Sequence, residues 1–146
     1  DKDGVDGAYM ICEMFSYYAT KGISLLDKLD ELYKTYGYCL NTLHSYEFDG
    51  SAGFAKMQSI MQAFRGDIKE FGGKKVVKLL DYAPGLDGLP KSDVLKFLLE
   101  DNCSIVVRPS GTEPKLKTYI SVSAENKEAA EAVEAEIRKS AEEFLK

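Results

Sequence analysis

The residues best suited to chemistry in this chain form one short stretch, RPSGTEPKLK at positions 108–117. Arg108 offers a planar fork of donors that matches two oxygens of a phosphate group, and such charge-assisted contacts are stronger than neutral hydrogen bonds. Ser110 and Thr112 add hydroxyl donors, and Lys117 adds a second positive charge. Gly111 lets the backbone turn so that successive N–H groups can point into one concavity, an anion nest. The stretch therefore predicts a phosphate-binding loop.

The same stretch has a simpler interpretation, because Ser-Gly-Thr between two prolines also makes an ordinary turn between two strands. Short motifs have many accidental matches, so the tripeptide alone favours the turn. The complete string is more specific. Arg-x-Ser-Gly-Thr-Glu-Pro followed by a basic residue resembles the phosphate-binding loop in the last domain of the α-D-phosphohexomutases, the superfamily of phosphoglucomutase and phosphomannomutase. The second basic residue of that pattern, often arginine, is Lys117 here.

Composition limits the other classes of function. The chain has 146 residues, of which 45% are hydrophobic, and this is enough for one domain with some extra structure attached. Its net charge of -5, with acidic residues spread along the chain, argues against a nucleic-acid-binding face. No apolar run approaches the roughly 18 residues that a membrane span needs. We therefore expect a cytoplasmic protein that binds neither nucleic acid nor membrane, in which local cations hold any anion.

The hydrophobic pattern predicts two helices, then strands alternating with helices. The first helix, about residues 5–20, is apolar around nearly its whole circumference, which is typical of a helix buried on most sides. The second begins with a capping box at Ser24 and Asp27 and ends at Gly37. Further helices are expected at 52–64 and 127–145, and strands at 42–48, 75–82, 94–99, 104–108 and 116–123.

These elements favour an α+β fold with a mainly antiparallel sheet of about four to five strands, covered on one face by two helices. The resemblance covers essentially the whole chain, strongest over residues 94–123 and weaker over 42–81. It implies that residues 1–40 are the C-terminal helices of phosphohexomutase domain 3, at the end of an α/β domain. Residues 41–146 would then be the TBP-like, phosphate-binding domain 4, so that the chain would be a C-terminal fragment.

In the superfamily that this chain resembles, a phosphoserine and a bisphosphate intermediate interconvert hexose 1-phosphate and 6-phosphate. Its Ser-His-Asn-Pro type of nucleophile loop and its Asp-x-Asp-x-Asp magnesium loop have no counterpart in this sequence. The resemblance thus implies no catalytic residue and no metal ligand here, and an inactive fragment that holds substrate phosphate through Arg108, Ser110, Gly111, Thr112 and Lys117. Mg²⁺ and a hexose 1,6-bisphosphate activator would serve the full-length enzyme. The expected partners are the phosphosugar and the missing N-terminal domains of the same chain.

Three other candidate sites are weaker. DKDGVDG at residues 1–7 begins like a calcium loop but lacks the required glycine and glutamate, so an acidic N-cap of the first helix suffices. GGKK at 72–75 lacks the other residues of a nucleotide P-loop and predicts a turn with solvated lysines. His44 is the single histidine, and a lone histidine at the start of a strand is more often a surface side chain than a catalytic residue.

Two alternatives to the mutase hypothesis stay open. One is a non-catalytic anion-binding or protein-interaction module that uses the same loop, and the weaker one is nucleic-acid binding through an uncovered face of the sheet. An apolar first helix also leaves open that the fragment dimerises to bury it.

Overall fold

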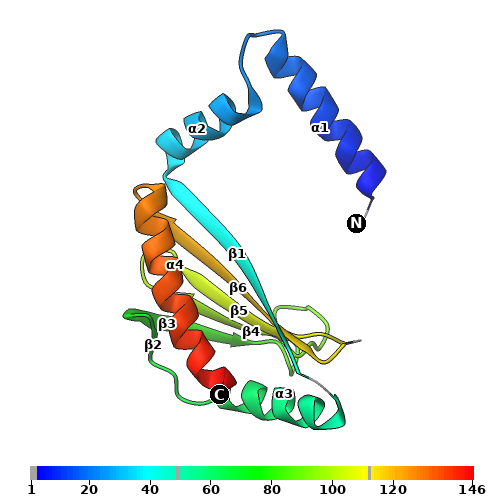
Figure 1. Ribbon diagram of the computed structural model, residues 1–146, viewed down its shortest axis with the longest axis vertical. Helices are drawn as coiled ribbons and strands as arrows, with labels where there is room; N and C mark the ends of the chain where they lie inside the picture. The colour runs from blue at the N-terminus through cyan, green and yellow to red at the C-terminus, as the bar shows by residue number, and fades with distance from the viewer. Residues whose placement is uncertain (1–2, 49, 112) are drawn as a thin grey trace. The chain divides into compact units, whose positions relative to one another are not determined.

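The computed structural model describes residues 3–48, 50–111 and 113–146 (Figure 1). The chain divides between Gly37 and Tyr38 into two compact units, which are described separately below. No helix among the described residues is both long enough and apolar enough to cross a membrane.

The first unit consists of α1 (Gly4–Ala19) and α2 (Leu25–Tyr36). The Asp3 carboxylate caps α1 by accepting hydrogen bonds from the backbone N–H groups of Val5 and Asp6, at 3.0 and 2.9 Å, so the expected acidic N-cap is confirmed. The capping box of α2 is confirmed as well, because Ser24 and Asp27 each accept a hydrogen bond from the other's backbone N–H. Hydrogen bonds from Ser24 lower the pKa of the Asp27 carboxyl.

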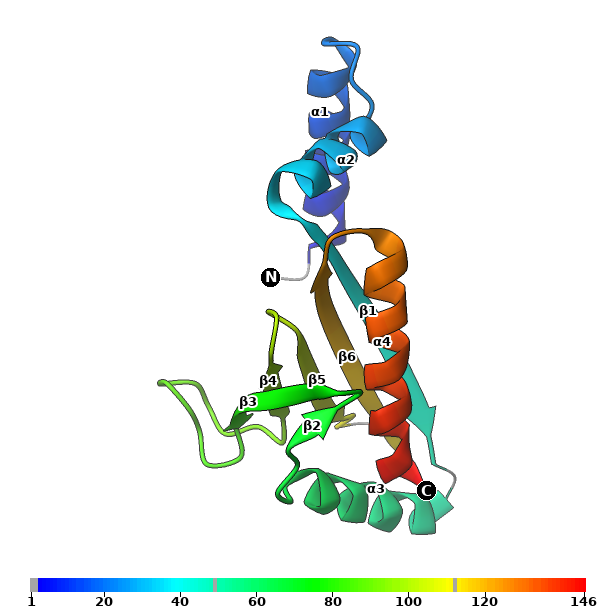
Figure 2. The ribbon, with the colours of Figure 1, turned by 90° about the vertical axis from the view of Figure 1, so that its left-hand side faces the viewer.

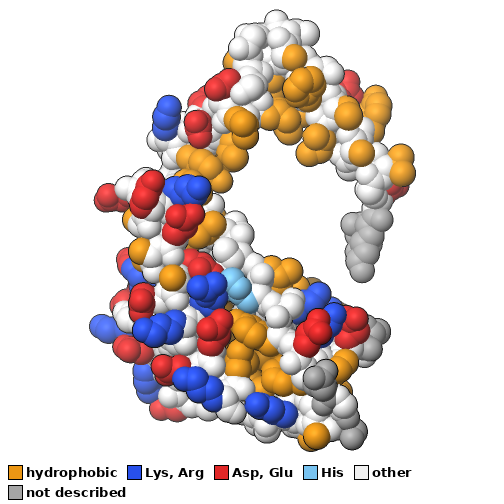
Figure 3. Space-filling view, in the orientation of Figure 1, with side chains coloured by type: hydrophobic (Ala, Val, Ile, Leu, Met, Phe, Trp, Pro, Cys, Tyr) orange, Lys and Arg blue, Asp and Glu red, His pale blue; other side chains and the backbone are white. Residues whose placement is uncertain are grey.

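Apolar side chains gather over α1 and α2, whereas charged side chains of both signs cover α4 (Figure 3). Neither helix of the first unit contains a buried residue. On α1 the large apolar side chains Val5, Tyr9, Met10, Ile11, Met14, Phe15 and Tyr17 are all exposed. Residues of this kind normally lie in a core, so α1 presents a surface suited to a partner.

The second unit contains one curled, fully antiparallel sheet with the strand order β1-β6-β5-β4-β3-β2. The strands are β1 (Tyr38–Glu47), β2 (Glu70–Phe71), β3 (Lys74–Asp81), β4 (Leu95–Leu99), β5 (Ser104–Pro109) and β6 (Lys115–Ala124). The α+β class and the antiparallel sheet are confirmed. The expected count of four to five strands is wrong, since the sheet has six strands within the described residues. The missed strand, β2, has two residues, too few to show an alternating pattern.

Helices α3 (Gly50–Phe64) and α4 (Lys127–Glu142) pack on one face of this sheet, and a short 3₁₀ turn (Glu143–Leu145) follows α4 (Figure 2). The core contains an aromatic cluster in which the Phe64 ring lies 4.8 Å from that of Phe144, and the Phe71 ring 5.0 Å from that of Phe97. The buried apolar residues are Met57, Ile60, Met61, Phe64, Phe71, Leu95, Phe97, Leu99, Cys103, Ile105, Val107, Leu116, Ile120, Val122, Ala130, Ile137 and Ala141.

The turn between β2 and β3 is pressed against α4. Gly72 has φ +56, and a Cβ there would lie 2.5 Å from backbone atoms of both Glu136 and Ile137. Only glycine combines this conformation with so close an approach. The hairpin therefore brings Phe71 into the core although the strand that carries it is very short.

The residues that alternate with the core residues along the strands point to the opposite side of the sheet, which we call the outer face. Along β1 and β6 the burial alternates strictly through most of each strand, which separates the two faces clearly. By register, the outer face comprises Glu70 of β2, Lys75, Lys78 and Leu80 of β3, Lys96 and Leu98 of β4, Ser104, Val106 and Arg108 of β5, Lys115, Lys117, Tyr119, Ser121 and Ser123 of β6, and Cys39, Asn41, Leu43, Ser45 and Glu47 of β1.

Candidate functional site

The predicted phosphate-binding loop, residues 110–114, connects β5 to β6 in the middle of the sheet. Two short backbone hydrogen bonds close it: Ser110 N–H donates to the Lys115 carbonyl at 2.7 Å, and Lys115 N–H donates to the Glu113 carbonyl at 2.7 Å. The N–H of Phe48, just beyond β1, donates to the Pro114 carbonyl at 2.9 Å. Backbone hydrogen bonds thus join the base of the loop to the start of β6 and to the residue that follows β1.

This bonding changes the expected anion nest. Ser110 N–H is already used inside the loop, so it does not point freely at a ligand as the sequence suggested. Gly111 does not lie in the left-handed region of φ, and a Cβ there would meet nothing within 4 Å. The glycine at position 111 is therefore not required by a strained turn. Its missing side chain leaves open space beside an exposed stretch of backbone. Thr112, the fourth predicted ligand, lies outside the described residues.

Arg108 and Lys117 form the centre of the site. They are directly opposite each other in the antiparallel pair of β5 and β6, on the outer face. Arg108 is exposed and Lys117 is partly exposed. Like charges directly opposite each other across two strands destabilise a sheet. Within the described part of the chain, neither side chain has an ion pair or a hydrogen bond that would offset this repulsion.

Lys115, on the same face, differs from this pair. Its ammonium lies 3.1 Å from a Glu47 carboxylate oxygen and 3.4 Å from one of Glu113. The hydrogen bond to Glu47, with the charge of Glu113, raises the pKa of Lys115. Two carboxylates thus neutralise Lys115, which leaves Arg108 and Lys117 as the cations available to an anion near the loop.

Two further residues of the site were missed by the sequence analysis. Ser45 of β1 is exposed and lies directly opposite Lys117, so that Ser45, Lys117 and Arg108 form one row across three strands. Lys96 of β4 lies opposite Val106 and is the diagonal neighbour of Arg108. The expected strand at 94–99 already carried the alternation that puts Lys96 on one face with Leu98. Only the register between strands shows that this is the face of Arg108.

A small recess adjoins the loop on another side. It has a volume of about 280 Å³ and is lined by Gly50, Phe54, Ser110, Gly111, Glu113 and Pro114. Phe54 of α3 is 57% exposed beside it. Its lining includes neither Arg108 nor Lys117 and carries the acidic Glu113, so the recess is poorly suited to a phosphate group.

His44 does not lie free at the surface as expected. Its Nε2 lies 2.7 Å from Oε1 of Glu134, which also accepts a hydrogen bond from the Thr42 hydroxyl at 2.8 Å. Glu134 is a buried residue of α4. The correction has a physical reason, since a buried carboxylate requires partners and His44 on the core face of β1 provides one. The contact joins α4 to β1 and has a structural role.

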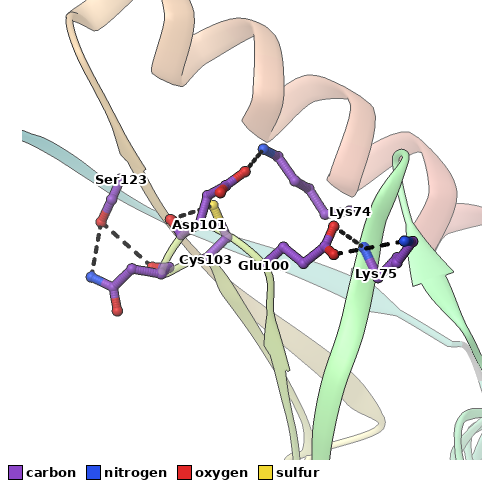
Figure 4. A network of polar contacts seen from close by, with 7 residues as sticks. Lys74, Lys75, Glu100, Asp101, Cys103 and Ser123 are labelled. Atoms are coloured by element: carbon purple, nitrogen blue, oxygen red, sulfur yellow. Dashed lines mark hydrogen bonds and ion pairs between the residues drawn. The ribbon is translucent and has the colours of Figure 1, made fainter.

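The GGKK stretch at 72–75 does form a turn, but its lysines are paired and not simply solvated. Lys74 lies 2.5 Å from an Asp101 carboxylate oxygen, and Lys75 lies 4.0 Å from one of Glu100 (Figure 4). Asp101 and Asn102, both with positive φ, form the turn between β4 and β5, and Asn102 contacts Ser123. This network stabilises two hairpins and resembles no nucleotide site.

No group of three or more His, Cys, Asp or Glu side chains in the described residues could hold a metal ion. The described residues thus offer no ligand set for Mg²⁺, which the family resemblance implies for the full-length enzyme. No chemical step in this chain is assigned to a metal.

Comparison with known proteins identifies the family of this chain. The family model described as phosphoglucomutase/phosphomannomutase, C-terminal domain, matches residues 49–140. The phosphoglucomutase of Staphylococcus saprophyticus is 33% identical over 138 residues, and that of Staphylococcus aureus strain MSSA476 is 37% identical over 138 residues. Each alignment covers 86% of this chain but 25% of the relative, so the chain spans about a quarter of the length of these curated relatives.

A solved structure shares the fold. The crystal structure of the exocytosis-sensitive phosphoprotein pp63/parafusin, a phosphoglucomutase from Paramecium in its open form, matches with a TM-score of 0.64 and 20% sequence identity. The match covers 99% of this chain and 27% of that one. The family model spans more than half of this sequence, including all of β2–β6 and α3, the seven residues of the predicted loop motif at 108–114 and Lys117. The chain therefore belongs to the phosphoglucomutase/phosphomannomutase family, and it corresponds to the C-terminal domain region of that family.

Proposed function

We propose that the second unit holds a phosphate group of a sugar phosphate, as part of a phosphoglucomutase or phosphomannomutase that interconverts hexose 1-phosphate and 6-phosphate. One observation carries the proposal: Arg108 and Lys117 lie opposite each other at the base of the loop, and within the described residues neither has an acidic partner. The repulsion between them is relieved when a dianion binds, because the anion makes charge-assisted contacts with both.

Each residue has a distinct role in this proposal. The guanidinium of Arg108 binds two phosphate oxygens through its planar fork, whereas the ammonium of Lys117 acts as a point charge. The Ser110 hydroxyl and the Gly111 backbone N–H add neutral donors, and Thr112 keeps the role that the family motif gives it. The chain itself holds and orients the sugar phosphate without forming or breaking a bond.

Holding the non-reacting phosphate is a substantial contribution to such a reaction. Phosphoryl transfer is catalysed largely by positioning and electrostatics, so a fixed dianionic handle orients the sugar at the reacting end. A loop that recognises only phosphate accepts either end of the sugar. A mutase needs this tolerance, because the 1- and 6-phosphates exchange places.

The remaining assignments belong to the same proposal. The first unit, up to Gly37, comes from the end of domain 3, and the second unit, from Tyr38, forms the TBP-like domain 4 of a longer cytoplasmic enzyme; this boundary lies three residues before the expected one between 40 and 41, because β1 begins at Tyr38. The phosphoserine, the Mg²⁺ and the hexose 1,6-bisphosphate activator serve the other domains. The exposed apolar residues of α1 contact those domains in the complete protein, or pair two copies of the isolated chain.

Calorimetric titration of this chain tests the binding role. Glucose 1-phosphate should bind more tightly than sulfate, and Arg108→Gln should weaken its binding by about tenfold or more, the usual loss for one charged contact to a phosphate. Lys139→Gln is the matched control, because Lys139 is an exposed cation of α4 far along the chain from the loop. Equal affinity for sulfate would favour the non-catalytic anion-binding module, and oligonucleotide binding with a steep salt dependence would contradict the proposal.

The complete enzyme gives the second test. Arg108→Ala should cost about 2–5 kcal/mol in kcat/KM, the range for removing one member of a desolvated charge pair. A change of less than a few-fold would exclude Arg108 from the substrate site. The chain alone should show no mutase turnover, and sustained turnover by the purified chain would contradict its role as a holding domain.

A further inference from the structure

The two edge strands of the sheet differ in how well they are protected from pairing with another chain. β2, at one end, has two residues, and the turn that follows it lies against the backbone of α4. β1, at the other end, has ten residues, pairs with β6 without a bulge and contains no lysine or proline (Figure 1). Short length, lysine, proline and bulges are the features that keep sheet edges from accepting foreign strands. β1 has none of them, so its open side can accept another strand.

One hydrogen bond shows which backbone groups of β1 point to the open side. Phe48 N–H donates to the Pro114 carbonyl at 2.9 Å, so the backbone groups at position 48 point toward the β6 side. These directions alternate along a strand, and the register between β1 and β6 is unbroken. The even-numbered residues of β1 therefore bond to β6. The odd-numbered residues, whose N–H and C=O groups point to the open edge, are Cys39, Asn41, Leu43, Ser45 and Glu47.

Nothing else in the described part of the second unit occupies these edge groups. No loop, helix or side chain among the described residues hydrogen-bonds to the backbone of the five odd-numbered residues. The side chains of the same five residues are exposed. The open edge thus offers a row of backbone donors and acceptors roughly 27 Å long.

The side-chain pattern of β1 fits a second copy of the same strand. Antiparallel pairing about a two-fold axis at Leu43 places Leu43 opposite its own copy. Leu43 already lies opposite Tyr119, and Tyr119 lies opposite Val106, so the pairing makes one apolar row across both sheets. Leu43 is 51% exposed in a single chain, so this contact buries apolar surface. The next hydrogen-bonded registers would instead set Leu43 against Asn41 or Ser45.

Polar and charged groups are compatible with the same register. Asn41 accepts a hydrogen bond from the Ser121 hydroxyl at 2.7 Å, and its side-chain amide can donate to Ser45 of the second copy, which lies opposite it. Glu47 lies opposite Cys39 of the second copy. The two Glu47 carboxylates are then at opposite ends of the strand pair, roughly 27 Å apart along the strands, so they do not repel each other.

We propose that β1 is a self-association edge, through which two copies of this chain pair antiparallel about a two-fold axis at Leu43 and join their sheets into one. About ten backbone hydrogen bonds form, a typical number for a protein interface, but the contact is only one strand wide. We therefore expect a weak dimer, with a dissociation constant on the order of 1–100 µM. Because β2 is short and its turn lies against α4, the assembly ends at two copies. Phosphate binding is not needed for this pairing.

Sedimentation of the whole chain over about 1–300 µM should show a monomer–dimer equilibrium. Leu43→Lys should weaken dimerisation by about tenfold or more, because two lysines would face each other across the axis. Val77→Lys is the matched control, since Val77 is 68% exposed on β3 and away from this edge. Phe15→Ser, on the exposed apolar surface of α1, tests the other route to a dimer. Neither control should change the dissociation constant.

Oxidative cross-linking tests the register by a gain of signal, so it does not depend on a variant that loses dimerisation. In a background of Cys12→Ser and Cys39→Ser, Leu43→Cys should form a disulfide-linked dimer, because hydrogen-bonded opposite residues lie about 5.5 Å apart at Cα. Asn41→Cys should not, since the two copies of position 41 are roughly 14 Å apart along the strands. Amide exchange should slow at the odd-numbered residues of β1 as the protein concentration rises, and not at the even-numbered ones.

A chain that stays monomeric throughout this concentration range would overturn the proposal, as would a dimer that Leu43→Lys leaves intact. Loss of the dimer in Phe15→Ser alone would place the interface on α1. Equal cross-linking of Asn41→Cys and Leu43→Cys, or assemblies larger than two copies, would contradict the two-fold register. Binding of unrelated extended peptides to a chain that does not dimerise would show that the edge takes another kind of partner.

Discussion

The two faces of the sheet treat polar and charged groups in opposite ways. On the core face, His44 and Thr42 both contact Glu134, and the Tyr46 hydroxyl donates to Glu142 at 3.1 Å. Burial, reinforced by Glu142, raises the pKa of Tyr46 to about 12. On the outer face, Arg108 and Lys117 face each other without an acidic partner among the described residues.

The difference follows from the cost of desolvation. A buried polar group without a partner costs free energy, so the core face pairs most of the polar groups it buries; among the described residues the buried Thr118 hydroxyl, opposite His44, is the exception. An exposed cation stays hydrated, so the outer face tolerates like charges at a small cost in stability. The unpaired charges on the outer face are therefore available to a ligand, whereas the paired groups under α4 stabilise the fold.

The largest expected effect belongs to the core face. Phe71→Ala should lower the free energy of unfolding by about 3–5 kcal/mol, because the fully buried ring contacts the other phenylalanines and its removal leaves a cavity. Leu43→Ala on the outer face should cost less than about 1 kcal/mol, because Leu43 is 51% exposed. Urea unfolding followed by circular dichroism measures both. Similar losses for the two variants would show that something covers the outer face.

An intermediate effect is expected where the core face pairs its polar groups. Glu134→Ala should cost about 1–3 kcal/mol, because it leaves His44 and Thr42 without their acceptor in a largely buried site. Glu131→Ala, on the exposed side of the same helix, removes a surface contact to Lys127 and should cost less than about 0.5 kcal/mol. Unfolding curves of the two alanine variants give the comparison directly. Equal costs would mean that the buried network contributes nothing beyond helix propensity.

The smallest effect on stability is expected at the candidate site. Arg108→Gln should change the free energy of unfolding by no more than about 0.5 kcal/mol, and should raise it slightly at low salt, because the repulsion from Lys117 disappears. The same variant should lose phosphate binding. Unfolding at low and high ionic strength, beside the binding titration, separates the two properties. A loss above about 1 kcal/mol would mean that Arg108 supports the fold, which would remove the main support for the phosphate site.

Local patterns predicted most of the elements. The capping box at Ser24, the end of α2 at Gly37 and the apolar spacing of α3 depend on residues within a few positions of one another, and all appear in the structure. Strand β2 could not be predicted this way. Its two residues pair only because Gly72 allows a turn against the backbone of α4, a contact between segments more than 60 positions apart.

The candidate site, too, could be predicted only where it depends on residues close together in the sequence. The motif from Arg108 to Pro114 is contiguous, so its residue types alone predicted an anion site and a family, and the family is now shown. The motif did not predict that Ser110 N–H closes the loop by bonding to Lys115. Such a bond depends on the geometry of the turn, which residue types leave open.

The sequence alone determined the chemistry available near residue 110, the family, and the helices and strands whose side chains repeat locally. The tertiary structure decided which side chains lie together. It brings His44 to Glu134, places Arg108 opposite Lys117, and puts Lys96 on the same face of the sheet as Arg108 and Lys117. The reason is that register and packing are set by the whole sheet and its core. A shift of one residue between two strands would exchange the faces and separate every one of these groups.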